Sequence, residues 1–231
     1  MGSTALAASA PAVRERPILF SAPMVRALLG GRKTVTRRLV KPQRGWKLGW
    51  YDKQGVIVPV NADRHGDPGD DITCPYGQPG ERLWVREAFH ITSANEAVYR
   101  ADYPGNATAR GMENIPAEQD VRWRPSIHMP RWASRLTLEV VSTSVERLHD
   151  ITEGDAQAEG AVFRDFGRGN YGRQRPGWAM SVEQLDRGTE HCLDTARFAF
   201  GNLWNAINGE NSWLSNPWVW RVEFRVLPAE W

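Results

Sequence analysis

The chain has 231 residues, of which 41% are hydrophobic and 24% are charged, and its formal net charge at pH 7 is only +2. This length suits one domain with insertions or at most two small domains, and 11 tryptophans help to supply a sizeable core. No apolar stretch approaches the roughly 18 to 20 residues that a membrane-spanning helix needs, so we expect no membrane partner.

The number and spacing of the cysteines indicate the redox compartment and whether a metal site is present. Two cysteines, Cys74 and Cys192, are typical of the reducing cytoplasm, although a single disulfide between them is compatible with the sequence. A zinc site built from both cysteines and His191 lacks the usual ligand spacing, because no C-x-x-C or H-x-E pair is present. We therefore expect a cytoplasmic protein with no metal and no cofactor.

The predicted elements begin after a small, polar tail at residues 1–16, which we expect to be disordered. A short strand at 18–20 leads into a helix that Ser21 caps and that ends at Gly30 and Gly31. Alternating or β-branched patterns predict further strands at 83–89, 97–101, 134–140 with an extension towards 148, and 218–224. Helical patterns predict helices at 152–160, with Thr152 as N-cap, and at 193–207.

This order of elements indicates an α+β fold, a mixed β-barrel that is closed or partly closed and carries a few flanking helices. One domain at 17–231 accounts for it, with insertions at about 42–80, 101–130 and 163–190. The first insertion is expected as a long excursion or hairpin. The last is rich in Gly and Arg and is expected to be mobile, either as an RNA-contacting segment or as a surface loop without function.

A concentration of positive charge marks residues 26–47. Eight basic residues and no acidic residue fall there: Arg26, Arg32, Lys33, Arg37, Arg38, Lys41, Arg44 and Lys47. Because the rest of the chain is net negative, this basic strip favours a phosphate-bearing partner. The alternative is an ordinary solvated face.

Residues 31–37, Gly-Arg-Lys-Thr-Val-Thr-Arg, follow the first helix and resemble the G-x-K-x-x-x-R signature of ASCH-domain proteins. Members of that family have β-barrels related to the RNA-binding PUA domains. Segments 79–85, 150–160 and 218–224 resemble other family segments in the same order, and the chain from about 17 to 227 is similar to the larger, prophage-type branch, including 74–77 and 127–132.

Small bacterial members of this family hydrolyse N4-acetylcytidine to cytidine and acetate. They use a lysine, a threonine three positions later and a glutamate on an acidic helix. The resemblance carries these catalytic roles to Lys33, Thr36 and Glu159, all of the required residue types. The long insertions depart from the compact members and leave the substrate open.

Amide hydrolysis requires a nucleophile, a base and an acid. A threonine hydroxyl is inert without a base, and Lys33 suits that role only if burial and the neighbouring Arg32, Arg37 and Arg38 disfavour its charged form. Thr34 is the rival nucleophile, because an offset of three shares a face in a helical turn but not in a strand. In the purely structural alternative, the threonines fill β-positions and the lysine reaches solvent.

Glu159 and Asp155 share a helix face at an i,i+4 offset. If both face the pocket, like-charge coupling would raise the pKa of one carboxyl group and hold a proton for the leaving amine. On a surface helix they would be ordinary solubilising charges.

Aromatic and charged side chains would recognise the pyrimidine by stacking and hydrogen bonding. The candidate substrate-binding residues are Arg37, Trp84, Arg86, Glu87 and Trp132, and the candidate nucleic-acid contacts are Arg32, Arg38 and Lys41. Tyr99 and Trp123 are further stacking candidates, while His128 is expected to be structural. The alternative is that the tryptophans belong to the core and that Arg86 forms a buried pair with Glu87.

The sequence thus favours a metal-independent amidohydrolase acting on an N-acylated pyrimidine nucleoside or nucleotide of the N4-acetylcytidine type. The alternatives are a non-catalytic RNA-binding module and a metal-independent ribonuclease. The expected partner is a modified nucleoside or RNA, and the oligomeric state is left open.

Overall fold

The computed structural model describes residues 13–41, 47–53, 56–62, 68–169, 172–173, 175 and 177–228. Most of the predicted tail at 1–16 lies outside these residues. Its end was assigned wrongly, because strand β1 (Glu15–Leu19) already begins there and pairs with a second strand.

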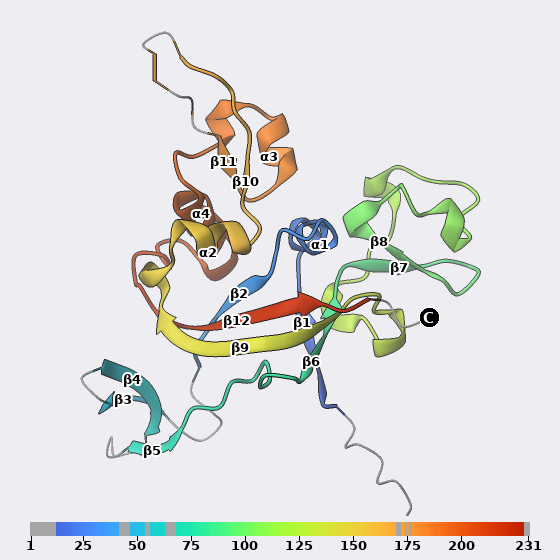
Figure 1. Cartoon of the computed structure of the whole chain (residues 1–231). Coiled ribbons are helices and arrows are strands. Elements are labelled where there is room, and N and C mark those ends of the chain that lie inside the picture. The colour runs from blue at the N-terminus through green and yellow to red at the C-terminus, as the bar shows by residue number, and fades with distance from the viewer. Residues whose placement is uncertain are drawn as a thin grey trace, which may run out of the picture.

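A mixed sheet of five strands forms the centre of the molecule (Figure 1), in the order β1-β6-β9-β12-β2. Its other members are β6 (Arg82–Arg86), β9 (Thr137–Arg147), β12 (Trp218–Val226) and β2 (Val35–Leu39). The pairing of β1 with β6 is parallel, and the other neighbours are antiparallel. The α+β class is therefore confirmed, while in the described part of the chain no pairing joins β1 to β2 and closes the sheet.

Period-two alternation explains the two sides of this sheet. On β12, Trp220, Val222 and Phe224 face a core that they share with β6 and α1, where Leu83 and Val85 are also fully buried. The intervening residues face the other way. There Val219 joins a second apolar cluster made by α2 and α4.

Three helices position the candidate site. Helix α1 (Ala22–Leu29) ends at Gly30, and α2 (Glu153–Ala158) begins with a capping box between Thr152 and Asp155. Helix α4 (Ala196–Asn208) begins with Thr195, whose hydroxyl accepts a hydrogen bond from the Phe198 N–H. Helices α2 and α4 pack against each other (Figure 1), and their apolar residues share a cluster with Val219 of β12 and Leu39 of β2.

Shorter elements surround the central sheet. Strands β3 (Lys47–Lys53), β4 (Val56–Ala62) and β5 (Pro68–Asp71) form an antiparallel sheet, so the expected hairpin within 42–80 is confirmed and extended by one strand. Strands β7 (Phe89–Ile91) and β8 (Ala97–Tyr99) form a hairpin. The predicted strand at 83–89 was too long, because β6 ends at Arg86 and Phe89 belongs to β7. The predicted strand at 97–101 was also too long, because it ends at Tyr99 and a 3-10 turn begins at Arg100.

Single 3-10 turns occupy much of the remaining chain. They are η1 (Arg100–Asp102), η2 (Thr108–Arg110), η3 (Glu118–Asp120), η4 (Ser126–His128), η5 (Arg131–Ala133), η6 (Leu148–Asp150) and η7 (Thr189–His191).

The segment at 163–190 is more structured than its composition suggests. Strands β10 (Val162–Phe163) and β11 (Trp178–Ala179) pair, and helix α3 (Val182–Asp186) follows them. Leu185 packs with Ala179 and Cys192 in a small buried cluster. The second half of this segment therefore carries regular structure, because a few apolar residues among the glycines and arginines suffice to anchor it.

Both cysteines are free and buried, so the compatible disulfide does not form. Over the described residues, no group of three or more His, Cys, Asp or Glu side chains is arranged to hold a metal ion. None of the helices in the described part of the chain combines the length and the apolar character that crossing a bilayer requires.

Candidate active site

The centre of the candidate site is a buried ion pair between Lys33 and Glu159. The Lys33 ammonium lies 2.6 Å from Glu159 Oε2, and the two side chains are 0% and 3% exposed. Lys33 Nζ also donates to the backbone carbonyls of Val35 and Glu159, at 2.9 Å each. An ammonium has three protons, and all three are therefore used inside the protein.

The backbone brings these two residues together although they lie 126 positions apart in the sequence. After α1, Gly31 adopts a left-handed conformation with φ +67, and the Lys33 N–H donates to the Ala27 carbonyl at 3.1 Å. The Thr34 N–H then donates to the Ala158 carbonyl at 2.9 Å, which ties this segment to the end of α2. Any other residue at position 160 would be strained, because φ is +108 and an added Cβ would lie 3.0 Å from the Ala27 Cβ.

Burial lowers the pKa of the Lys33 ammonium, because the charged form loses its hydration. The charge of Glu159 and its hydrogen bond oppose this effect, while the guanidinium groups of Arg38 and Arg37 add to it. The pKa of Lys33 is therefore lowered overall. The predicted influence of burial and neighbouring cations on Lys33 is thus present, with Arg37 and Arg38 as the contributing arginines rather than Arg32.

Arg37 connects Glu159 to two further carboxylates. Its Nε donates to Glu146 Oε1 at 2.7 Å, and its Nη1 donates to Glu159 Oε1 at 3.5 Å. Its Nη2 is 3.4 Å from Asp155 Oδ2, within ion-pair distance but without hydrogen-bond geometry. Arg37 is itself buried and contacts all three carboxylates, while Lys33 and Arg221 supply further positive charge to Glu159 and Asp155.

The expected coupling between Asp155 and Glu159 does not raise the pKa of Asp155. Burial alone would raise the pKa of Asp155, but the hydrogen bond from Thr152 and the charges of Arg37 and Arg221 outweigh it, and the pKa is lowered. Asp155 therefore does not hold a proton for the leaving amine. Arg37 contacts both carboxylates, so a cation lies beside the two like charges.

A small cavity of about 40 Å³ opens beside Glu159, between β2 and α4. It is lined by Met24, Thr36, Arg37, Arg38, Leu39, Glu159, Phe200, Leu203, Trp204, Ile207 and Asn208. Trp204 is buried in this wall, and its indole Nε1 has no hydrogen-bond partner in the described structure. An unpaired buried donor is costly, so a group that accepts a hydrogen bond from it is favoured in the cavity.

The two candidate nucleophiles have different surroundings. Thr36 is 1% exposed, lines the cavity with Glu159 and lies opposite Val222 in the sheet. Thr34 is exposed, and it lines a separate open groove with Phe163 and Trp178. The surroundings favour Thr36 as the hydroxyl that acts together with Glu159.

The predicted aromatic and charged contacts lie elsewhere. Trp84, Arg86, Glu87 and Trp132 do not line this cavity. Glu87 forms two hydrogen bonds with Arg135, at 2.9 and 3.0 Å, so the suggested pairing of Arg86 with Glu87 is wrong.

Arg86 instead donates to the Ile127 carbonyl. Its guanidinium also lies over Trp84, 5.3 Å from the ring centroid. Trp132 is 61% exposed, so it gives no enclosed stacking surface.

The basic strip at 26–47 is not one solvated face. Lys33 and Arg37 are buried, and Arg38 donates to the Leu19 carbonyl at 2.7 Å with its guanidinium over Phe20. Of the candidate nucleic-acid contacts, only Arg32 and Lys41 are exposed. Arg44 and the Lys47 side chain lie outside the described residues.

Residues from α4 and β9 complete the site without having been predicted. Trp204 and Phe200 form a wall of the cavity, and Glu146 pairs with Arg37. The helical pattern of 193–207 indicated that α4 would have a buried face, but it carried no signal for the strand that this face covers.

No family model, curated protein or solved structure matched the chain. The chemistry of the site is therefore inferred from its own residues. A lysine whose charged form is disfavoured, a carboxylate in direct contact with it and a buried hydroxyl at the same cavity are the groups that acyl transfer by general acid-base catalysis requires.

Proposed function

We propose that this protein is a metal-independent amidohydrolase that acts on an N-acylated pyrimidine nucleoside or nucleotide of the N4-acetylcytidine type. The supporting observation is the buried Lys33 to Glu159 contact of 2.6 Å beside the cavity that Thr36 and Glu159 line. The resemblance of residues 31–37 to the ASCH signature supplies the substrate class.

The first step of the proposed mechanism is a proton transfer within the ion pair. Movement of one proton from Lys33 Nζ to Glu159 Oε2 leaves a neutral amine and a neutral carboxylic acid. Burial disfavours the charged ammonium of Lys33, because that form has lost its hydration. A base and an acid are thereby formed side by side.

Thr36 Oγ then attacks the acyl carbonyl carbon, and its proton passes to Lys33 Nζ. The C–N bond breaks as the nitrogen of the leaving cytosine takes the proton from Glu159, which gives an acyl ester on Thr36. Water hydrolyses that ester, with Lys33 and Glu159 exchanging protons in the reverse sense. The Trp204 indole N–H is the proposed donor to the acyl oxygen, where negative charge develops.

The volume of the cavity restricts how the substrate binds. About 40 Å³ is little more than the share of liquid volume of one water molecule, which is about 30 Å³. The cavity therefore accommodates the small acyl group, with the pyrimidine at its mouth near the exposed Ile207. Entry of the ring requires side chains of α4 to move.

The same contacts argue against the alternative functions at this site. An RNA-binding module or a ribonuclease would use Lys33 as a cation that contacts phosphate. Lys33 is 1% exposed, and its three protons are already donated to protein acceptors. A phosphate cannot reach it without breaking the ion pair.

Two further proposals concern the fold and the cellular compartment. We propose that the open pairing order β1-β6-β9-β12-β2 represents a PUA-like barrel whose two edge strands are linked through α1. The free, buried cysteines agree with a reducing compartment such as the cytoplasm.

Hydrolysis of N4-acetylcytidine, followed by chromatography, tests the proposed activity. We expect Lys33→Arg and Thr36→Val to lose about two to four orders of magnitude in kcat/KM, the usual range for a general base. Thr34→Val is the matched control and should retain activity, because Thr34 is exposed on another surface. Wild-type protein without turnover on acetylated pyrimidines would refute the proposal.

A further inference from the structure

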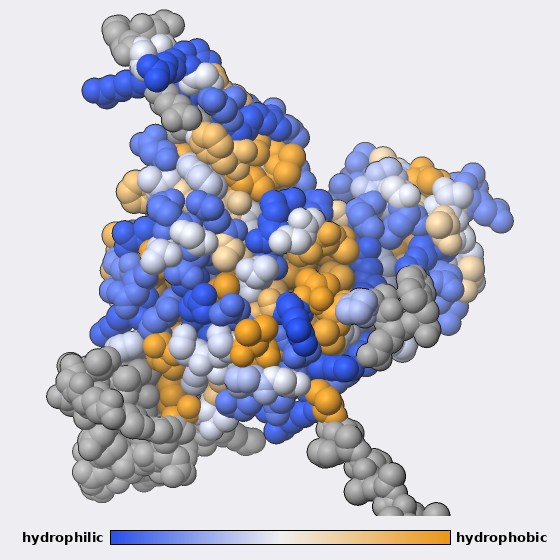
Figure 2. Space-filling view, viewed as in Figure 1, coloured by the Kyte–Doolittle hydropathy of each residue, from blue (hydrophilic) through white to orange (hydrophobic). Residues whose placement is uncertain are grey.

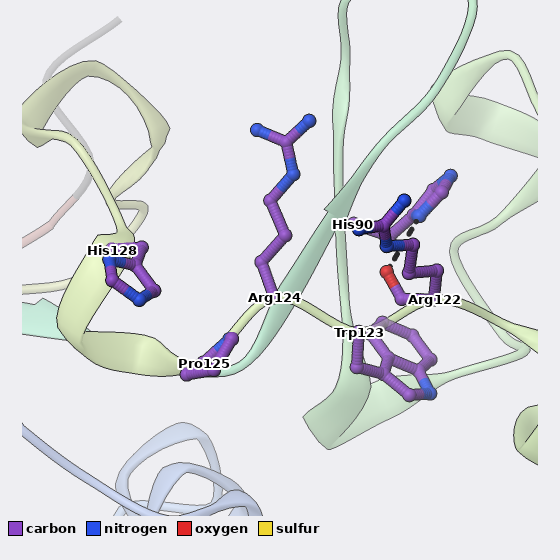
Figure 3. A pocket seen from close by; sticks show the side chains of 6 residues that line it. All are labelled: His90, Arg122, Trp123, Arg124, Pro125 and His128. Atoms are coloured by element: carbon purple, nitrogen blue, oxygen red, sulfur yellow. Dashed lines mark hydrogen bonds between the residues drawn. The ribbon is translucent and has the colours of Figure 1, made fainter.

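A second concave site lies on the β7–β8 side of the molecule. The groove has a volume of about 470 Å³ and is lined by His90, Arg122, Trp123, Arg124, Pro125 and His128 (Figure 3). This volume falls within the range of about 300 to 1,000 Å³ that is typical of ligand sites. It shares no lining residue with the cavity beside Glu159.

The backbone of the groove is held in place by the neighbouring strand. Arg124 and Phe89 exchange two backbone hydrogen bonds, at 2.7 and 3.2 Å, and His90 Nδ1 lies 3.2 Å from the Arg122 carbonyl oxygen. Figure 3 shows the Arg124 side chain extending between His90 and His128. The lining is therefore pre-organised by β7 rather than carried on a free loop.

Trp123 provides the aromatic wall. Its Nε1 donates to the Glu118 carbonyl at 3.0 Å, and Tyr103 packs edge-on against its ring with the centroids 5.3 Å apart. These contacts fix the ring, while its surface is only partly buried. A fixed, accessible indole can stack on a planar ligand at a low cost in side-chain entropy.

The two arginines of the groove are not neutralised. Among the described residues, no carboxylate lies within ion-pair distance of Arg122 or Arg124, and both side chains are exposed. Other arginines of the same region have such partners, since Arg100 pairs with Glu118 and Arg110 with Glu96. The lining itself contains no acidic residue.

We propose that this groove binds a nucleotide unit of single-stranded nucleic acid, with phosphate on Arg122 and Arg124 and a base stacked on Trp123. Guanidinium groups suit phosphate, and an aromatic face binds unpaired bases of any sequence. Duplex bases are stacked on one another and would not reach the indole. The surface around the β7–β8 unit is mainly hydrophilic in Figure 2, which suits a charged polymer better than an apolar peptide.

The proposal is independent of the hydrolytic activity and can be tested without it. Fluorescence anisotropy with a labelled single-stranded oligouridylate measures binding at several salt concentrations. We expect Arg122→Ala with Arg124→Ala to reduce the salt slope by about 1.4, from about 0.7 per phosphate contact on a single strand. Trp123→Ala should weaken binding about 5- to 150-fold, and Trp123→Phe should restore most of it.

The control variant removes the same charge elsewhere. Arg164→Ala with Arg225→Ala deletes two exposed arginines that are paired with Asp186 and Glu139, and it should leave binding unchanged. Melting curves establish that each variant is folded. If both double variants weaken oligonucleotide binding equally, binding depends on general charge attraction and the proposal is wrong.

Three competitors separate the sources of the ligand chemistry. Unlabelled oligouridylate should displace the probe far better than inorganic phosphate or duplex RNA does. If phosphate competes as well as the oligonucleotide does, the site binds simple anions and the proposal is wrong. Hydrolysis of the free nucleoside N4-acetylcytidine should be unaffected by the Arg122 and Arg124 substitutions. The result for the groove is therefore independent of the result for the proposed activity.

Discussion

Glu159→Gln isolates the energetic role of the buried ion pair. The substitution keeps the shape of the side chain but leaves the Lys33 ammonium, which is 1% exposed, without its carboxylate. Removing one partner of a buried pair typically costs about 3 to 5 kcal/mol. Lys33 can limit this cost by losing its proton, and for a lysine with an unfolded pKa of about 10.4 that costs about 4.6 kcal/mol at pH 7.

The cost of deprotonating Lys33 also makes the stability of the variant depend on pH. In the variant, folded Lys33 is neutral while the unfolded chain binds a proton, so stability relative to wild type rises with pH. The loss in free energy of unfolding should therefore be about 3 to 4.5 kcal/mol at pH 7 and at most about 2 kcal/mol at pH 9.

Urea denaturation at the two pH values measures this difference. Glu139→Gln is the control, because Glu139 pairs with the exposed Arg225 and its loss should cost less than about 1 kcal/mol at either pH. A loss below about 1 kcal/mol for Glu159→Gln at pH 7, or a loss that does not change with pH, would contradict the burial and charge assigned to the pair.

Three further predictions concern the surroundings of the site. Gly160→Ala should lower the free energy of unfolding by more than about 1 kcal/mol, because φ is positive and the added Cβ would lie 3.0 Å from the Ala27 Cβ. Thermal unfolding measures this loss, and an unchanged melting temperature would exclude the strain. Asp155→Asn should cost about 1 kcal/mol at pH 7 in urea denaturation, because it weakens the hydrogen bonds that the Asp155 carboxylate accepts from the Thr152 N–H and hydroxyl. Since the pKa of Asp155 is lowered in the folded state, its stabilisation is present above the unfolded value of about 3.9 and is lost as the pH falls through the folded value, so the difference should vanish in strong acid. Trp204→Phe should reduce kcat/KM on an acylated pyrimidine about tenfold or more while the melting temperature changes little, and full activity would exclude the indole N–H as a donor.

The convergence of Lys33 and Glu159 was predicted from the sequence. That prediction came from the resemblance to ASCH-domain proteins, which implies joint roles for Lys33 and Glu159. The local signals, a glycine helix exit and an N-cap at Thr152, predicted only where each residue lies relative to its own helix. Local signals place residues at helix ends reliably, because capping depends on backbone groups a few positions away. The cation between the two carboxylates of α2 was not predicted, because Arg37 reaches them only through the pairing of β2 with β12.

The aromatic candidates failed for a different physical reason. Alternation on β6 correctly separates Leu83 and Val85 from Trp84 and Arg86, but it does not say which face the helices cover. The wall of the cavity comes from α4, far along the chain from β6. Only the three-dimensional packing decides which aromatic residue lies beside Glu159.

The position of β2 at the edge of the sheet has a consequence for biosynthesis. Its only partner in the described sheet is β12, and the Phe224 N–H donates to the Thr34 carbonyl just before β2. The strand that carries Thr36 consequently has no template until residues 218–226 have left the ribosome. Nascent chains that stop before β12 can form α1 and the end of α2 but not the completed cavity, so the site cannot assemble until β12 has been synthesised.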